Sequence, residues 1–376
     1  AAGSGSLDIG ADVGSTGTVT LIGAGTAWSN ISQSVVAGDA GTGSLTVENG
    51  ALVNVETGYV GNYSGSVGAI TVTGAGSEWT SSYLGVGSFG QGMLTVKDGG
   101  AVNSAAGGTF GVGIFPGSSG SVVVTGTSSQ LNVSSWLLVG PGGGTGSLTI
   151  ESGGTVNSGG AFLGGEGPTT TGTGAAFVRG IGSQWNTPFL EVGSTGSGTL
   201  LIQDGGIVNS GGSSLGTFEG GSGSATVSGA GAEWITSNLY VGLSGPGTLT
   251  VNNGGVVTAG ILQSPGTITI GTSGTVSADG GTLQGTVINH GTLDPLGTIT
   301  INGDYTQGVD GTLILDVAGT GLGDFGQLDV SGNATFNGTL DFDFIDGFAP
   351  AMGDSFDFIN VMGSADLSGA TIDIGG

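Results

Sequence analysis

The chain has 376 residues, of which 88 are glycine, and its formal charge of −25 comes from 27 acidic residues against two basic residues, Lys97 and Arg179. This charge excludes nucleic acid as a partner, because affinity for nucleic acid depends on clustered Lys and Arg. The lack of cysteine excludes a disulfide framework and a thiolate metal site, and no apolar run approaches the roughly 18 residues of a transmembrane segment.

A short pattern repeats along most of the chain, and the segment Gly92–Val102 (GMLTVKDGGAV) is one clear copy. It joins an alternating apolar/polar triplet, a glycine turn and a second apolar segment. The triplets begin at Val19, Leu45, Ile70, Leu94, Val122, Leu148, Ala176, Leu200, Ala225 and Leu249. A fixed spacing of about 25 residues indicates stacked structural repeats.

A third short segment, which ends in glycine, lies between the second apolar segment of one repeat and the triplet of the next, as in Val60-Gly61 and Val86-Gly87. We therefore predict three short strands in each coil. Glycine costs roughly 1 kcal/mol relative to alanine inside a helix and supplies the positive φ of tight corners. The fold class that follows is all-β: a right-handed β-solenoid (parallel β-helix) of about 25-residue coils with a C-terminal β module.

Four parts follow one another along the chain. Residues 1–18 hold one N-terminal edge strand, and residues 19–265 hold ten coils of the solenoid. The repeat spacing shortens over residues 266–302. Residues 303–376 form an acidic, Phe-rich C-terminal β module, in which residues 339–345 and 355–359 alternate strictly and predict longer strands with one wet face.

Two rows of side chains follow from aligning the coils. The first alternates large residues with valine, and its tryptophans are Trp28, Trp79, Trp185 and Trp234. We place this row in the core, because tryptophan beside valine in adjacent coils fills space without overpacking; the alternative is an exposed row that stacks on carbohydrate.

The second row is asparagine in five consecutive coils: Asn103, Asn132, Asn157, Asn186 and Asn209. Identical amides stacked along an axis form hydrogen-bonded ladders. Because neighbouring positions of a strand face opposite sides, we expect this ladder on the face opposite the tryptophan row. The alternative, asparagine in a left-handed conformation at a corner, is also structural.

The distance from the start of a triplet to the next large apolar residue alternates between 9 and 8 residues along the coils, as from Ile70 to Trp79 and from Leu94 to Val102. This two-coil unit resembles a repeat of bacterial surface proteins. The clearest copies are LTVKDGGAV at Leu94–Val102 and TVTGAGSEW at Thr71–Trp79, and the segment from Val287 to Gly332 adds a tail. Together they are similar to autotransporter passenger domains and PEP-CTERM-associated repeat proteins, a resemblance that implies a β-helix exported to the cell surface. The start Ala1-Ala2-Gly3 also fits cleavage of a signal peptide, so we expect a secreted, extracellular or cell-surface protein.

We predict no catalytic residues. A polysaccharide lyase needs a base and cations that stabilise an anionic intermediate, whereas Lys97 and Arg179 lie about three repeats apart. Calcium is the one metal that we consider, at Asp341, Asp343 and Asp346, because their spacing is similar to that of a calcium loop, although the third acid is one residue late and no Glu follows. We expect no other cofactor.

The sequence favours a non-enzymatic, secreted structural protein of the bacterial cell surface or matrix, which joins head to tail with copies of itself into a fibre. The edge strands that we assign to this assembly contain Leu7, Asp8 and Ile9 at one end and Ile372, Asp373 and Ile374 at the other. One alternative is an adhesin passenger that binds a glycan or matrix ligand. Another is a polysaccharide-degrading β-helix enzyme, which would place two carboxylates across a cleft.

Overall fold

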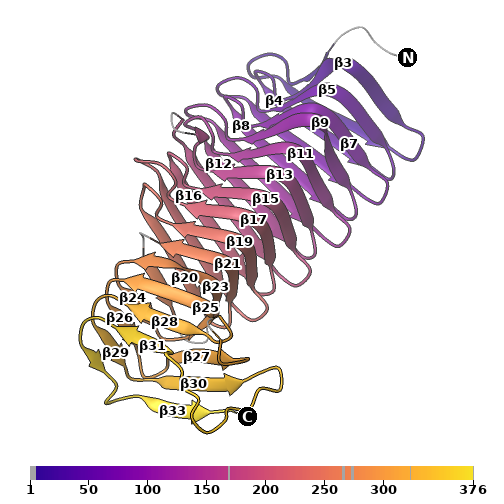
Figure 1. Ribbon diagram of the computed structural model, residues 1–376. Helices are drawn as coiled ribbons and strands as arrows, with labels where there is room; N and C mark the ends of the chain where they lie inside the picture. The colour runs from indigo at the N-terminus through magenta and orange to yellow at the C-terminus, as the bar shows by residue number, and fades with distance from the viewer. Residues whose placement is uncertain (1–5, 168–169, 265–266, 272–274, 322, 376) are drawn as a thin grey trace.

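The structure, a computed structural model, describes residues 6–167, 170–264, 267–271, 275–321 and 323–375. The described residues contain no α-helix, and their strands stack in parallel along one axis into an elongated body (Figure 1). The predicted β-solenoid is confirmed. Strands of the same sheet recur about 25 residues apart, because each circuit of the backbone ends on top of the one before.

Two parallel sheets make up the solenoid. Sheet A has 18 strands: β1 Leu7–Ile9, β3 Ala27–Ala37, β5 Leu52–Val60, β7 Glu78–Val86, β9 Ala101–Val112, β11 Gln130–Val139, β13 Thr155–Leu163, β15 Gln184–Val192, β17 Ile207–Leu215, β19 Glu233–Val241, β21 Val256–Ser264, β23 Thr275–Gln284, β25 Thr292–Asn302, β27 Thr312–Val317, β28 Gln327–Val330, β30 Thr339–Phe344, β31 Ile359–Val361 and β33 Thr371–Ile374.

Sheet B has 15 shorter strands: β2 Thr16–Ile22, β4 Thr42–Glu48, β6 Val67–Thr73, β8 Gln91–Lys97, β10 Ser119–Thr125, β12 Thr145–Glu151, β14 Thr173–Arg179, β16 Ser197–Gln203, β18 Ser222–Ser228, β20 Gly247–Asn252, β22 Thr267–Ile270, β24 Val287–Asn289, β26 Tyr305–Gln307, β29 Ala334–Phe336 and β32 Ala365–Asp366. The triplets of the repeat lie in these strands.

The register of sheet B follows the repeat of the sequence. Leu94 on β8 pairs with Ile70 on β6 and with Val122 on β10, so equivalent triplet positions lie directly over one another. The side chains of Ile70, Leu94 and Val122 all point into the core, whereas the residues next to each of them in its own strand lie on the outer face.

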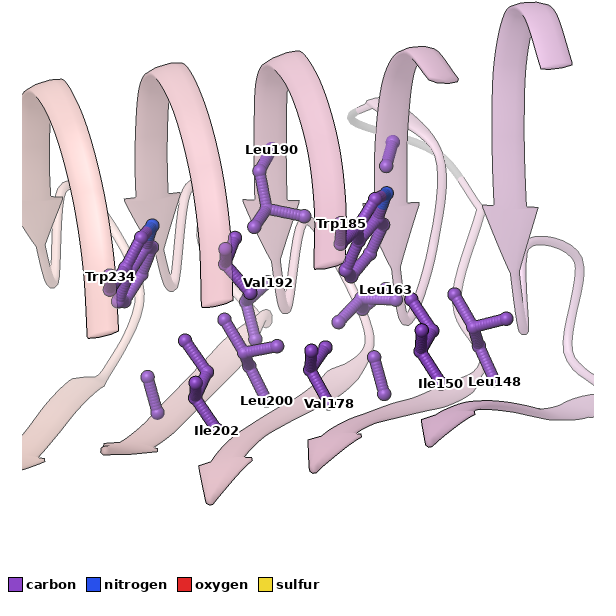
Figure 2. Packing of buried hydrophobic residues seen from close by; sticks show 14 of the residues in the cluster. Leu148, Ile150, Leu163, Val178, Trp185, Leu190, Val192, Leu200, Ile202 and Trp234 are labelled. Atoms are coloured by element: carbon purple, nitrogen blue, oxygen red, sulfur yellow. The ribbon is translucent and has the colours of Figure 1, made fainter. Parts of the chain in front are cut away.

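Up to β25 each described coil has two strands, so the prediction of three short strands in each repeat was wrong. The second and third predicted segments belong to one long, curved strand of sheet A, as the arched ribbons in Figure 2 show. In β5 the buried positions are Val53 and Val55 and then Gly58 and Val60. The alternation of buried and exposed residues thus shifts by one residue between Val55 and Gly58. Because of this shift, the strand bends around the core, and both of its halves face the core without a break in the strand.

The core lies between the arch of sheet A and the flat strands of sheet B. Figure 2 shows Leu148, Ile150, Val178, Leu200 and Ile202 of sheet B opposite Leu163, Trp185, Leu190, Val192 and Trp234 of sheet A. Trp79, Trp185 and Trp234 are completely buried. Trp28 is only half-buried, because β1 pairs with the other half of β3, at residues 35–37, and no strand covers residues 27–30.

Glycine occupies the sharp corner that follows the long strands from β3 to β19. Gly61 follows β5 with φ of 71°, and a Cβ there would lie 2.2 Å from the carbonyl oxygen of Gln91. Gly68, the second residue of β6, lies close to the same corner, since its Cβ would lie 2.3 Å from the Gly61 nitrogen. Both positions therefore require glycine.

From residue 303 onwards the strands continue in the same two sheets. After β25, sheet A divides into two rows, one of β27, β30 and β33 and the other of β28 and β31. The strand predicted at 339–345 is present as β30. Of the strand predicted at 355–359, only Ile359 lies in a strand, because only residues 359–361 reach β28, whereas Phe356 and Phe358 pack their rings on Phe325.

Candidate functional site

Both ends of the described solenoid leave strand edges without a partner. The core is partly open there, since the half-buried apolar residues that border it lie mainly at the ends. At the N-terminal end these are Leu7, Val19 and Trp28, and at the C-terminal end Phe342, Phe358, Ile359, Val361 and Ala370. Unpaired backbone edges of this kind can pair with another strand.

A row here means the residues of one sheet that pair in register from one coil to the next. The strand pairing places the two predicted edge strands in different rows of sheet A. The row that starts with Leu7 on β1 passes through Val35 and ends at Ile359 on β31. The row that starts with Trp28 on β3 ends at Ile372 on β33. The counterpart of β1 at the far end is therefore β31, and β33 is the counterpart of the open half of β3.

Carboxylates lie close to both ends. Burial raises the pKa of Asp8 above its ordinary value, and the charge of Asp39 raises it further. At the other end Asp373 on β33 pairs in register with Asp341 on β30. The pKa of Asp341 is raised by burial and then by the charges of Asp343 and Asp373.

The candidate calcium residues lie at the C-terminal end. Asp341 and Asp343 are alternate residues of β30, and Asp346 follows in a turn with φ of 53°. Among the described residues, no group of three or more His, Cys, Asp or Glu side chains is arranged to hold a metal ion. Calcium at these residues stays a prediction that rests on the sequence.

The two cations lie apart from each other. The Lys97 ammonium is 3.9 Å from a carboxylate oxygen of Asp98, and the Arg179 guanidinium is 2.7 Å from one of Glu151. Along sheet B, Lys97 and Arg179 are three strand spacings apart, about 14 Å at the usual distance between strands. The two cations therefore lie in separate ion pairs on different coils.

The asparagine row forms a continuous hydrogen-bonded ladder on the outer face of sheet A. Each side-chain amide donates from its Nδ2 to the Oδ1 of the asparagine in the preceding coil, at 2.8–2.9 Å, from Asn209 through Asn186, Asn157 and Asn132 to Asn103. Asn103 donates in turn to the carboxylate of Glu78 at 2.8 Å. A carboxylate is a strong hydrogen-bond acceptor. Glu78 therefore accepts the last hydrogen bond of a ladder in which every amide donates in the same direction.

The sequence did not predict a buried polar network on β24 and β26, which follow the ten predicted coils. The Asn289 amide donates to the Tyr305 hydroxyl at 3.1 Å, and this hydroxyl donates to Oε1 of Gln307 at 3.1 Å. Gln307 also donates to the backbone carbonyls of Gly311 and Thr339 at 3.0 and 2.8 Å. The three side chains are almost completely buried, and the only sequence signal is a polar residue where earlier coils have Ile or Val.

Neither a protein-family model nor a curated protein matches this chain. In the part of the chain that the structure describes, no helix is long and apolar enough to cross a membrane.

Proposed function

We propose that this chain is a non-enzymatic structural protein that stacks end to end with copies of itself into an extracellular fibre. The observation that supports the proposal is the correspondence of the two ends. Each end exposes strands from the same three rows, namely β1, β2 and the open half of β3 at one end and β31, β32 and β33 at the other. A head-to-tail contact of this kind does not close, and so it propagates.

The rows define the register of the junction. If a second copy continues the stack, Ile359 and Val361 of one copy lie over Leu7 and Ile9 of the next. Ile372, which is 62% exposed, then covers the half-buried Trp28 ring. The core rows of the two copies become continuous, and burial of this apolar surface drives the association.

The outward residues of this register do not oppose like charges. Asn360, whose amide already donates to Asp329 at 2.9 Å, faces Asp8 of the next copy. Asp373 faces Ser29. The junction therefore repeats the pairing of amide with carboxylate that Asn103 and Glu78 make inside the solenoid.

Cysteine pairs test this register, because the chain has no cysteine of its own. Adjacent strands are about 4.8 Å apart, within the roughly 4.4–6.8 Å between Cα atoms that a disulfide spans. We expect the double variant Trp28→Cys/Ile372→Cys to form covalent ladders under oxidation. The matched pair Leu7→Cys/Ile372→Cys joins different rows and should not.

Electron microscopy of the unmodified chain provides the second test. Filaments are expected, and Ile372→Asp should abolish them, whereas Ile181→Asp, at a side chain that is 89% exposed on the flank, should not. Monodisperse monomers of the unmodified chain, or covalent ladders from the Leu7→Cys/Ile372→Cys pair alone, would refute the proposal. The extracellular location is supported by the resemblance of the repeat to exported surface proteins.

A further inference from the structure

A hollow of about 500 Å³ lies on the flank of the solenoid, at the ends of β5, β7 and β9 and the turns that follow them. Five aromatic side chains from these three coils line it, together with Asn62 and Ser88: Tyr59, Tyr63, Tyr83, Phe89 and Phe115. Trp79, Trp185 and Trp234 of the core row are buried, whereas Tyr63, Phe89 and Phe115 are 56%, 46% and 40% exposed. A cluster of exposed large apolar side chains on a soluble surface indicates a binding site.

The rings are ordered by contacts with one another. Phe89 and Phe115 stack with 4.3 Å between ring centroids and 13° between planes, and the Tyr59 and Tyr83 centroids are 5.7 Å apart. Aromatic pairs in such arrangements stabilise each other. The hollow is therefore preformed, and little conformational entropy is lost when a ligand enters.

The polar groups of the hollow suit a ligand rich in hydroxyl groups. They are the hydroxyl groups of Tyr59, Tyr63 and Tyr83 and the side-chain amide of Asn62. Burial raises the pKa of Tyr83 to about 12, and Tyr59 adds to the shift, so the Tyr83 phenol remains a neutral hydroxyl that can donate or accept.

The charge of the site selects against anions. None of the described residues that line the hollow is a cation, and the two cations of the chain are paired with Asp98 and Glu151 on sheet B. The carboxylate of Asp39 lies beside the hollow and accepts a hydrogen bond from Asn62 at 2.8 Å. A phosphorylated or acidic ligand would be repelled there.

A second group of rings lies further along the same face. Trp136 on β11 occupies the row of Tyr83, and its ring forms a cluster with those of Phe162 on β13 and Phe189 on β15, with centroids 5.2 to 6.0 Å apart. Trp136 is 39% exposed. Aromatic side chains thus follow the solenoid axis over the coils from β5 to β15, a length on the order of 25 Å at the usual strand spacing.

We propose that this aromatic face binds a linear, neutral polysaccharide, with one part of the ligand in the hollow around Phe89 and Phe115. The C–H faces of neutral sugars pack on aromatic rings, and their hydroxyl groups meet the few polar groups that a binding site needs for orientation. The alignment of the rings along the axis matches a chain and not a single sugar. This proposal does not depend on fibre formation.

Affinity electrophoresis of the full chain tests the proposal. Native gels would contain one of three soluble neutral glucans, with β-1,4, β-1,3 or α-1,4 linkages, and bovine serum albumin would serve as the marker that does not bind. We expect at least one glucan to retard the chain, and Phe89→Ala/Phe115→Ala to weaken the retardation at least tenfold. Phe348→Ala, a matched loss of a ring near the C-terminal end, should not change it.

Tyr63→Phe separates binding from folding. It keeps the exposed ring and removes its hydroxyl group, so the melting temperature should stay the same while the retardation falls about twofold or more. A merely structural role for Tyr63 predicts no change in retardation. No retardation by any of the three glucans, or retardation that Phe89→Ala/Phe115→Ala leaves unchanged, would overturn the proposal.

Discussion

The substitution Trp185→Ala tests how much the alternating core row stabilises the solenoid. Trp185 is completely buried between Val156 and Val208, and its indole N–H donates to the Ser158 hydroxyl at 3.2 Å. Loss of a buried tryptophan side chain costs about 3–5 kcal/mol, and the buried Ser158 hydroxyl that is left unpaired adds about 1 kcal/mol. We expect a loss of about 4–6 kcal/mol.

Trp28→Ala is the matched control, because it removes the same side chain from the same row. Trp28 is half-buried and has a neighbour, Val53, on one side only, so we expect a loss of about 2 kcal/mol. Urea unfolding followed by far-UV circular dichroism measures both variants. A loss for Trp185→Ala that is no larger than that for Trp28→Ala would refute the assignment of this row to the core.

Three further predictions concern polar side chains. Asn157→Ala leaves the next amide of the ladder without its acceptor, so it should lower the free energy of unfolding in urea by about 1–2 kcal/mol, whereas Thr226→Ala on the outer face of sheet B should change it little. Burial raises the pKa of Glu191 above its ordinary value of 4.5, and one of its carboxylate oxygens has no hydrogen-bond partner. The folded state therefore binds a proton at Glu191 more tightly than the unfolded state does, and the stability that protonation provides is lost as pH rises from 4.5 through the raised pKa. Glu191→Gln, which carries no charge, should therefore raise the melting temperature at pH 7. A gain that persists at pH 4 would contradict this account. Gln307→Leu removes the acceptor of the buried Tyr305 hydroxyl and the amide donor of the Gly311 and Thr339 carbonyls, of which the Gly311 carbonyl keeps the Thr339 N–H. We expect a loss of about 1–3 kcal/mol in thermal or urea unfolding; an unchanged midpoint would show that water replaces the amide.

The triplets alone predicted the parallel stacking of the coils. The side-chain period of a strand is two, so a shift of one residue would expose every apolar residue of a triplet such as Leu94-Thr95-Val96. Repetition of the triplet at about 25 residues leaves one register that buries all of them. The same period of two predicted the tryptophan row and the asparagine row on opposite faces of sheet A, since the two rows occupy neighbouring positions of each strand.

The number of strands in each coil could not be read from the sequence. A glycine usually marks a turn, but the corner inside a long strand such as β5 is made by a change in which side chains point inward, at Val55 and Gly58. This change depends on the arch that sheet A forms over sheet B.

The candidate surfaces were likewise decided by the tertiary structure. Leu7–Ile9 and Ile372–Ile374 are alike in sequence, yet they lie in different rows, because the sheet divides after β25 and the match between the ends becomes β1 with β31. The aromatic hollow depends on turn residues of three coils that are about 25 residues apart, such as Tyr63, Phe89 and Phe115. The sequence by itself thus determined the repeat and its inward rows through the strand period, while contacts between distant residues decided the shape of each coil, the pairing of the ends and the surface that faces a ligand.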